Sequence, residues 1–468
     1  MFNKKFYTIL AILLFSVILW QCPAPQGLNK DGWHLLIIFT STILGVIFSV
    51  AKMGVVTIIG LIVLVLTDTL SIGKALSGFK SSTVWLVVLA FFTARGFVKT
   101  GLGRRVAYMM ISKFGNSLTG LSYSLIYTEF LISPMIPSVV ARGGGIIYPI
   151  VQSLINAYSG SHEKKETEKI GAFLVQLCFQ SNIITSALFL TAMAANPLIV
   201  SIASNFGIKI TWSSWFISAI IPGIICLALL PMILFKLIKP VESNLNAAPK
   251  IAREELKKMG KITKPEYIMI STLVLMIVLW IIGDKIGVDA TTVAFLGFII
   301  LVVTRVLDWD ETISQKSAWE TLIWFSILLM MSTFLTDYGV TGWLGDKIRY
   351  LFAETDKMLV FISLLAIFFF LHYLFASISA YVTVMYGTFL SVLLNIGIPT
   401  EIAAMSLAFV AILSGGITHF SIGSAPMFFS TRYISTLNWW KLGFIINAFN
   451  VILFLTLAIG WWKIIGLW

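Results

Sequence analysis

Long apolar runs recur along the whole chain and constrain its fold more than any other feature. Each run is about as long as a helix that crosses the roughly 30 Å hydrocarbon core of a bilayer. The runs lack the apolar–polar alternation of barrel strands, so we expect helices. Of 468 residues, 58% are hydrophobic and 12% charged, whereas a soluble domain is about half apolar and a quarter charged. The sequence therefore predicts an all-α polytopic membrane protein and excludes collagen-like, coiled-coil and nucleic-acid-binding chains.

Eleven of the runs predict transmembrane helices. Their approximate ranges are 6–22, 34–50, 54–70, 83–99, 172–200, 213–237, 267–284, 288–306, 318–338, 400–429 and 440–462. Two further apolar stretches, 117–157 and 358–396, are interrupted near their middles by Pro, Gly or Ser residues. We expect each to be a re-entrant hairpin, because non-helical backbone at membrane depth must be surrounded by protein or a watery cavity.

The basic residues predict how the chain lies in the membrane. With a cytoplasmic N-terminus, the inside loops hold 22 of the 33 Lys and Arg residues and the outside loops hold nine, while Arg95 and Arg142 fall within apolar segments. Because cytoplasmic loops carry the excess of basic residues, we expect the N-terminus inside and the C-terminus outside. The first run is not followed by a small-residue cleavage site, and no Arg/Ser-rich transit peptide precedes it. We therefore expect a retained first span in a bacterial plasma membrane.

Known metal and catalytic signatures are missing from the sequence. The three cysteines, Cys22, Cys178 and Cys226, have no paired spacing, so neither a disulfide framework nor a CxxC site is expected. Neither HExxH nor GxSxG is present, which argues against a membrane-embedded enzyme. We expect no metal, no cofactor and no enzymatic activity.

The two halves of the chain repeat the same order of segments. Each half has a hairpin with a serine at its middle, followed by a span interrupted at Asn196-Pro197 or at Ala425-Pro426. Inverted repeats with broken helices are typical of secondary transporters, whereas an anion channel would not need them. We expect scaffold spans at 1–80 and 267–317, a polar cytoplasmic linker at 240–266, and repeats at 81–239 and 318–468.

The hairpin centres predict an anion site between the two tips. Helix N-termini there supply free N–H groups and a positive dipole end, and Ser138, Ser377 and Ser379 add hydroxyl donors. The alternative is that small serines only permit tight helix packing, but their placement at both centres favours binding. Thr185 and Thr418 each follow a serine by four places and are weaker candidates, since threonine often bonds back along its own helix.

Arg142 is the sharpest single candidate, because an arginine inside an apolar segment usually faces a cavity or a partner. It would hold a substrate carboxylate through two parallel hydrogen bonds, or pair with Glu129, which a hairpin centred between Met135 and Ile136 places opposite it. Both alternatives stay open, and its position one helical turn after Ser138 slightly favours substrate.

Three other polar side chains are secondary candidates. Arg95 and Lys99 share a helix face and would replace a coupling cation or attract anions, although Lys99 is equally suited to snorkel to the headgroups. His419 lies beside the second broken helix. We expect it either to be a hydrogen-bonded structural residue or to contact the substrate.

Five motifs resemble those of the divalent anion/sodium symporter superfamily. Ser133–Gly145 is similar to its PxxPSTTARAGG hairpin. Phe92–Gly103 resembles the ARGFVKTGLG motif of one branch, and His372–Tyr381 its HYxFASQTAH motif. Thr191–Pro197 and Gly415–His419 also match. That branch contains plastid 2-oxoglutarate/malate translocators and bacterial citrate/succinate and tartrate/succinate antiporters.

The resemblance implies a homodimer in the lipid bilayer, with a scaffold and a transport domain in each protomer. It also implies an elevator-like movement and a dicarboxylate anion held between the hairpin tips. In the sodium-coupled branch both tips read Ser-Asn-Thr, whereas here they read Pro137-Ser138-Val139 and Ser377-Ile378-Ser379. The missing asparagines imply sodium-independent antiport, and the alternative is a sodium-coupled symporter of the same fold.

The tips also depart from the antiporter pattern. Val139 and Val140 replace Thr-Thr, Ile378 replaces Gln, and Tyr381 replaces His. Several substrates therefore stay open: succinate, malate and 2-oxoglutarate, with citrate and tartrate as further candidates.

Overall fold

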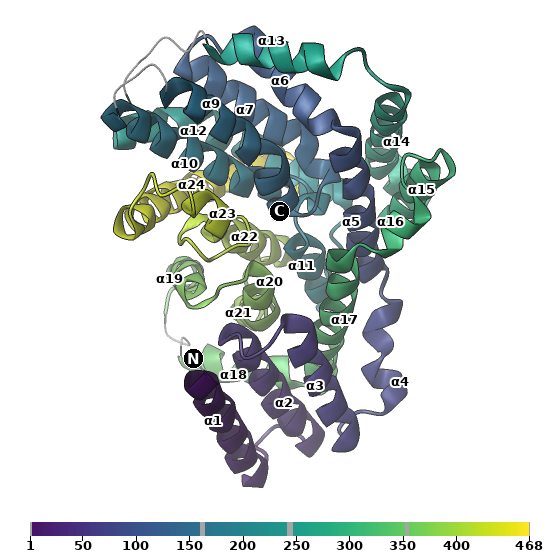
Figure 1. Ribbon diagram of the computed structural model, residues 1–468. Helices are drawn as coiled ribbons and strands as arrows, with labels where there is room; N and C mark the ends of the chain where they lie inside the picture. Colours follow the sequence, from purple (N-terminus) through teal and green to yellow (C-terminus); the bar gives the residue numbers. More distant parts are fainter. Residues whose placement is uncertain (1, 160–163, 241–246, 352–354, 468) are drawn as a thin grey trace.

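The computed structural model describes residues 2–159, 164–240, 247–351 and 355–467. Within these ranges helices are joined by loops and turns, and no β-strand is present (Figure 1). Nine helical segments in the described ranges are long and apolar enough to cross a membrane. They are α2 (Lys30–Ile47), α5 (Ser82–Thr100), α10 (Lys164–Leu188), α12 (Trp212–Ile238), α14 (Lys264–Ile286), α17 (Lys316–Asp337), both arms of the second hairpin, and α24 (Thr436–Ile464). Five shorter apolar helices are α1 (Phe2–Gln21), α3 (Met53–Leu66), α11 (Ala195–Ser204), α15 (Ala290–Val303) and α22 (Thr400–Leu413).

A helix lies at every predicted span, and two of those spans are broken. The span expected at 172–200 consists of α10, which ends at Leu188, and α11, which begins at Ala195. The span expected at 400–429 consists of α22 and the short α23 (Ala425–Phe429). The number of helices that cross the membrane stays a prediction.

Side-chain caps fix where many of these helices begin. A capping oxygen accepts a hydrogen bond from an N–H group of the first turn, which has no partner inside the helix. Lipid has no acceptor for such an N–H group. Thr211 and Thr263 form capping boxes at the starts of α12 and α14. Further caps are Asn29, Ser117, Asp289 and Ser435.

Both expected hairpins have the same internal construction. The first contains α7 (Leu118–Ile132), the 3-10 turn η2 (Ser133–Met135), α8 (Val139–Arg142), the π-helical η3 (Gly143–Ile147) and α9 (Tyr148–Ser159). The second contains α19 (Lys357–Leu371), η5 (His372–Leu374), α20 (Ile378–Tyr381), the π-helical η6 (Val382–Tyr386) and α21 (Gly387–Ile396). From the 3-10 turn onward, each element begins 239 positions after its counterpart, as Ser133 and His372 or Val139 and Ile378 show. The internal repeat therefore keeps its register through both breaks.

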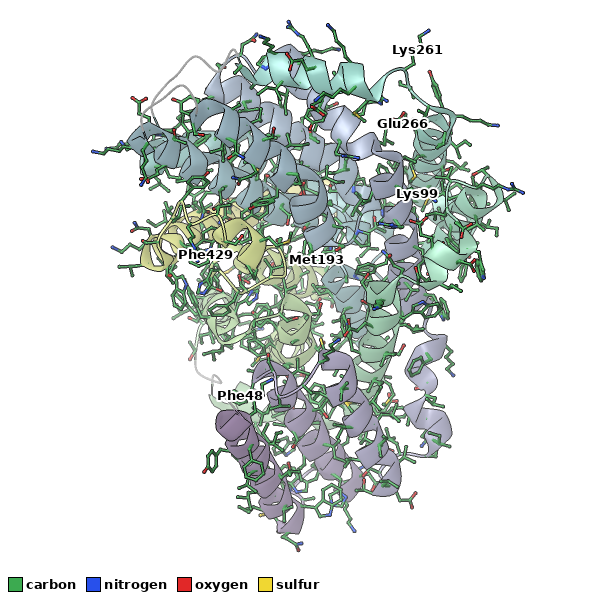
Figure 2. All side chains as sticks on the ribbon, in the orientation of Figure 1. Phe48, Lys99, Met193, Lys261, Glu266 and Phe429 are labelled. Atoms are coloured by element: carbon green, nitrogen blue, oxygen red, sulfur yellow. The ribbon has the colours of Figure 1, made fainter. Side chains whose placement is uncertain are left out.

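The segment expected to be a polar linker is largely a helix. Residues 241–246 lie outside the described ranges, but α13 (Ala247–Met259) packs on α6 (Leu102–Phe114) and lies across one end of the molecule in Figure 1. Arg105 of α6 donates to Glu266 of α14 at 2.5 Å and to the carbonyl oxygens of Met259 and Gly260. Figure 2 shows Glu266 and Lys261 at this junction. One buried arginine thus joins the end of α13 to the start of α14.

The broken helices form the buried centre of the fold. From Ile170 to Leu188, every residue of α10 is buried, and α24 packs against α12 and the turn η7 (Ser414–Gly416) that ends α22. At Gly443 the backbone of α24 approaches this turn closely. A Cβ there would lie 2.8 Å from the carbonyl oxygen of Gly416 and would also overlap that of Ile417.

We therefore expect Gly443→Ala to lower the thermal stability of the purified protein, because the added methyl group would meet backbone rather than a flexible side chain. Gly460→Ala is the matched control on the same helix, since a Cβ at Gly460 meets nothing within 4 Å. There the helix propensity of alanine should leave stability equal or raise it by about 1 kcal/mol. Equal effects of the two substitutions on the melting temperature would contradict the close approach.

Candidate functional site

Each hairpin tip presents the capped start of a helical run. Ser138 accepts the N–H of Ala141 at 3.1 Å, and Ser377 accepts that of Ala380 at 3.4 Å. Both serines are half-buried. Because the hydroxyl oxygen serves as the cap, the hydroxyl hydrogen stays available to donate. The two tips therefore offer equivalent donors at equivalent positions of the repeat.

Arg142 is completely buried and is held by five hydrogen bonds. Its Nε donates to Glu129 Oε1 at 2.9 Å, as the hairpin spacing predicted for one alternative. Nη1 donates to the carbonyl oxygens of Ile136 and Ala192, and Nη2 donates to Ser186 Oγ at 2.6 Å and more weakly to the carbonyl oxygen of Asn182. A guanidinium has five N–H groups, so none remains for a ligand in this geometry.

This network joins the first hairpin to the first broken helix. Asn182 of α10 donates to the same Glu129 oxygen at 2.6 Å, and Thr191, in the break between α10 and α11, donates to the carbonyl oxygen of Pro134. Ser424, beside the second break, donates to Asn182 Oδ1 at 3.2 Å. The two broken helices and the first hairpin are therefore one connected polar unit inside an apolar protein.

The second hairpin is joined to its own broken helix by different chemistry. Tyr381 occupies the position of Arg142, and its hydroxyl donates to the carbonyl oxygen of Phe368, which stands where the first hairpin has Glu129. His372 is buried, stacks on the Tyr381 ring at 4.6 Å, and bonds Ser414 Oγ at 2.7 Å through Nδ1. In the second hairpin the hydrogen bonds of an imidazole and a phenol therefore hold the segments together, whereas in the first hairpin those of a guanidinium group do so.

The other residues predicted at the tips differ in accessibility. Ser379 is half-buried, whereas the side chains of Val139 and Ile378 are buried. Ile378 points toward Gly415, where a Cβ would lie 3.4 Å from its Cδ1. The serines are thus the tip side chains best placed to meet a ligand.

Each of the weaker candidates makes a hydrogen bond within the protein. Thr185 donates back to the carbonyl oxygen of Asn182 at 3.2 Å, and Thr418 accepts the N–H of Phe420 at 3.4 Å. His419 is half-buried and accepts the indole N–H of Trp440 at 3.0 Å. Substrate contact by these three residues stays a prediction that no contact of the structure favours.

Arg95 and Lys99 meet the same carboxylate away from the tips. Both pair with Glu311 of α16 (Trp309–Ile313), at 2.7 and 2.6 Å. The hydrogen bond from Lys99, together with that from Arg95, holds the pKa of Glu311 below its ordinary value against partial burial. The two basic residues therefore tie α5 to α16, and one carboxylate serves two cations, so these three groups together keep one positive charge.

Sequence reasoning missed several residues of this network. Of these, only His372 lies in a motif described above, at the start of His372–Tyr381, whereas Asn182, Ser186, Ser414 and Ser424 lie outside the five motifs. Their partners come from other helices, so no spacing along the chain pointed to them. Asn182, a buried amide in an apolar span, carried the one usable signal, because such a group must find a partner.

Broken helices that meet two hairpins inside an all-helical, apolar protein define a membrane transporter. The chain belongs to the sodium:sulfate symporter family, because the model of that family's transmembrane region matches residues 3–468. The superfamily resemblance of the hairpin motifs is thereby confirmed.

The chain is similar over almost its whole length to three proteins named as transporters. The chain is 43% identical to a Bacillus subtilis protein provisionally named as a malate transporter, over 99% of this chain and 97% of the relative. It is 44% identical to chloroplastic dicarboxylate transporter 1 of Arabidopsis thaliana, over 98% and 83%. It is 28% identical to the L-tartrate/succinate antiporter of Escherichia coli, over 99% of each chain. All three are named as transporters rather than enzymes.

Two solved structures share the fold. The antimetabolite efflux pump MtrF of Neisseria gonorrhoeae superposes with a TM-score of 0.60 at 14% identity, over 97% of this chain and 94% of the other. The YdaH transporter of Alcanivorax borkumensis gives 0.56 at 13% identity, over 99% and 98%. At these identities the likeness concerns the fold alone.

The contacts of Arg142 predict what its removal does. Arg142→Gln leaves Glu129 as a buried charge without its cation, which typically costs about 3–5 kcal/mol, so the variant should express poorly and melt early. Changing both partners to Gln should restore part of the lost stability. Arg95→Gln is the control, because the Arg95 side chain is 41% exposed and that of its partner Glu311 is 24% exposed, and solvent-exposed pairs contribute at most about 1 kcal/mol. An Arg142→Gln protein as stable as the parent would contradict the structural role.

Proposed function

We propose that the protein exchanges small dicarboxylates across the membrane, with the anion held between the two hairpin tips. The observation that carries the proposal is the pair of capped helix starts at Ser138 and Ser377, in register within the repeat. Helix N-termini and hydroxyl donors suit a molecule with a carboxylate at each end. The relatives named for malate, dicarboxylate and tartrate/succinate transport support this substrate class.

Sodium independence is supported by the tips and by Arg142. Sodium needs several oxygen ligands, and unwound backbone carbonyls commonly supply them in transporters. Here the carbonyl oxygens of Ile136, Asn182 and Ala192 already accept hydrogen bonds from the guanidinium. Neither tip has the asparagine of the sodium-coupled pattern. We therefore propose that Arg142 occupies the oxygen atoms a coupling ion would need, rather than binding substrate.

We further propose an elevator-like movement within a homodimer, with a cytoplasmic N-terminus and an outside C-terminus in a bacterial plasma membrane. The bonds of each hairpin to its own broken helix support the movement of these elements as one body. The excess of basic residues in the predicted inside loops supports the orientation.

Counterflow in proteoliposomes tests the exchange. Labelled malate should enter vesicles preloaded with unlabelled malate, and it should do so equally in sodium and in choline, because the anion gradient alone drives an exchanger. Empty vesicles should take up little label. Sodium-driven uptake into empty vesicles would instead establish the alternative, a sodium-coupled symporter.

The tip serines should contribute directly to affinity. Ser138→Ala and Ser377→Ala each remove a donor to a charged acceptor, worth roughly 1.5–3 kcal/mol, so transport affinity should fall about tenfold to a hundredfold. Both changes also remove a helix cap. Ser117→Ala is therefore the control, since Ser117 caps α7 at the far end of the first hairpin and its loss should affect stability only. Unchanged affinity in both tip variants would show that these serines only pack.

A further inference from the structure

An apolar groove of about 340 Å³ lies between α1, α2 and α3, which stand side by side at one end of the molecule in Figure 1. The groove follows α1 from Ile9 to Trp20, and residues of α2, of α3 and of the turn between them complete its lining. An α-helix rises about 16 Å over this stretch, and the hydrocarbon core of a bilayer is roughly 30 Å thick. The groove therefore has about the length of one leaflet.

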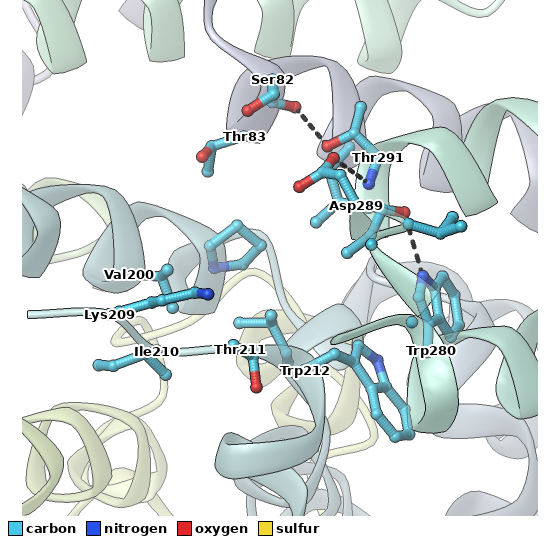
Figure 3. Close-up of a pocket in the computed structure, with 17 residues that line it drawn as sticks. Ser82, Thr83, Val200, Lys209, Ile210, Thr211, Trp212, Trp280, Asp289 and Thr291 are labelled. Atoms are coloured by element: carbon cyan, nitrogen blue, oxygen red, sulfur yellow. Dashed lines mark hydrogen bonds between the residues drawn. The ribbon is translucent and has the colours of Figure 1, made fainter. Parts of the chain in front are cut away.

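The hydroxyl groups in this lining are bonded within their own helices. Each donates at 2.7 or 2.8 Å to the carbonyl oxygen four residues before it, and the hydroxyls belong to Ser16, Ser41, Thr42 and Thr67. No charged side chain belongs to the described lining of the groove. The cavity in Figure 3 is different, because Lys209 and Asp289 line it with opposite charges. Water in a cavity needs polar partners, so the groove favours hydrocarbon over water.

The helices α1 and α2 run antiparallel along the groove. The hydroxyl oxygens of Ser16 and Ser41 are 2.6 Å apart, and nearer the end of α1 the rings of Trp20 and His34 stack with centroids 3.7 Å apart. Moving back along α1 therefore corresponds to moving forward along α2. The start of α1 lies beside the turn from α2 into α3, and both line the same end of the groove.

Two lysines flank this end of the groove. Lys5 lies about one helical turn before Ile9, where the lining on α1 begins, and Lys52 directly follows the turn from α2 into α3. Both lysines are exposed, and neither forms an ion pair in the described parts of the chain. The opposite end has residues of both charge signs, namely Lys30, Asp31 and Asp68. The groove is therefore an apolar channel with a cationic group at one end only.

We propose that the groove binds one acyl chain of an anionic phospholipid, whose phosphate group meets Lys5 and Lys52. The chain fits the length of the groove and needs no polar contact from its lining. Bulk lipid offers any acyl chain similar apolar surroundings, so the two ammonium groups decide which lipid stays bound. They attract a headgroup with a net negative charge, whereas the cationic part of a zwitterionic headgroup meets like charge. With the N-terminus in the cytoplasm, as proposed, this lipid belongs to the cytoplasmic leaflet.

Native mass spectrometry of the purified full-length protein tests the headgroup contact without transport. Phosphatidylglycerol and phosphatidylcholine with identical acyl chains are titrated in detergent, and we expect phosphatidylglycerol to bind more tightly. Lys5→Gln and Lys52→Gln should each weaken its binding about fivefold and leave that of phosphatidylcholine unchanged. Lys30→Gln is the matched control, because Lys30 begins α2 at the opposite end of the groove. Equal binding of the two lipids by the parent protein, or lysine variants that bind phosphatidylglycerol as well as the control does, would overturn the proposal.

A second pair of variants tests the groove itself. Ile59 lines the groove and its neighbour Ile58 does not, while both side chains are exposed. Ile59→Trp fills part of the groove and should weaken the binding of phosphatidylglycerol, whereas Ile58→Trp should leave it unchanged. Equal effects of the two substitutions would overturn the inference. A dimer that Ile59→Trp dissociates without a change in lipid binding would also overturn it, because the groove would then be an interface between two copies of the chain. Dicarboxylate exchange enters neither measurement, so its absence would refute the proposed function alone.

Discussion

Arg142 is fully buried at the centre of the fold. A buried guanidinium group is stable only when an anion balances its charge and every N–H group has a hydrogen-bond acceptor. Its partners come from α7, the first tip, α10 and the break before α11. Displacing any one of these segments leaves a buried donor or acceptor unpaired. The first hairpin and the first broken helix are therefore held in one relative position. The same contacts fix the position of the capped tip.

The sequence predicted the fold well where the signal was local. Apolar runs located the helices, and Pro and Gly residues located both hairpins, because each signal acts within one or two turns of chain. The pairing of Arg142 with Glu129 was also foreseeable as an alternative, since a hairpin brings near neighbours together. Choosing between substrate contact and the pairing with Glu129 required knowing the acceptors of all the Arg142 N–H groups. Three of these acceptors belong to residues 40 to 50 positions from Arg142 along the chain, namely Asn182, Ser186 and Ala192.

Contacts between distant segments could not be read from the sequence. Arg105 lies 161 positions from Glu266, and Arg95 lies 216 from Glu311. The linker was expected only to be polar, although apolar residues recur at helical spacing in α13, at Ala248, Ile251, Ala252, Leu256 and Met259, a pattern that predicts an amphipathic helix. The helix starts at Ser138 and Ser377 were therefore predictable from the sequence, but the residues that hold the two tips in place were not.

The two halves of the repeat share a backbone and differ in the chemistry that supports it. Both hairpins contain a 3-10 turn, a capped helix start and a π-helical segment in the same register. The first is held by an ion pair, and the second by His372 and Tyr381. The shared register through the π-helical segments therefore does not depend on the identity of the supporting side chains.

The capping role of Ser138 and Ser377 has a consequence for the ionic form of the proposed substrate. Each serine oxygen receives one backbone N–H, which uses one of its two lone pairs and leaves the hydroxyl hydrogen free to donate. If the tips bind a dicarboxylate as proposed, each hydroxyl donates to an ionised carboxylate, whose oxygen atoms only accept. Protonation of one carboxylate turns one of these acceptors into a donor and weakens the match. Acidification of the medium would therefore reduce the concentration of the form to which both serines can donate.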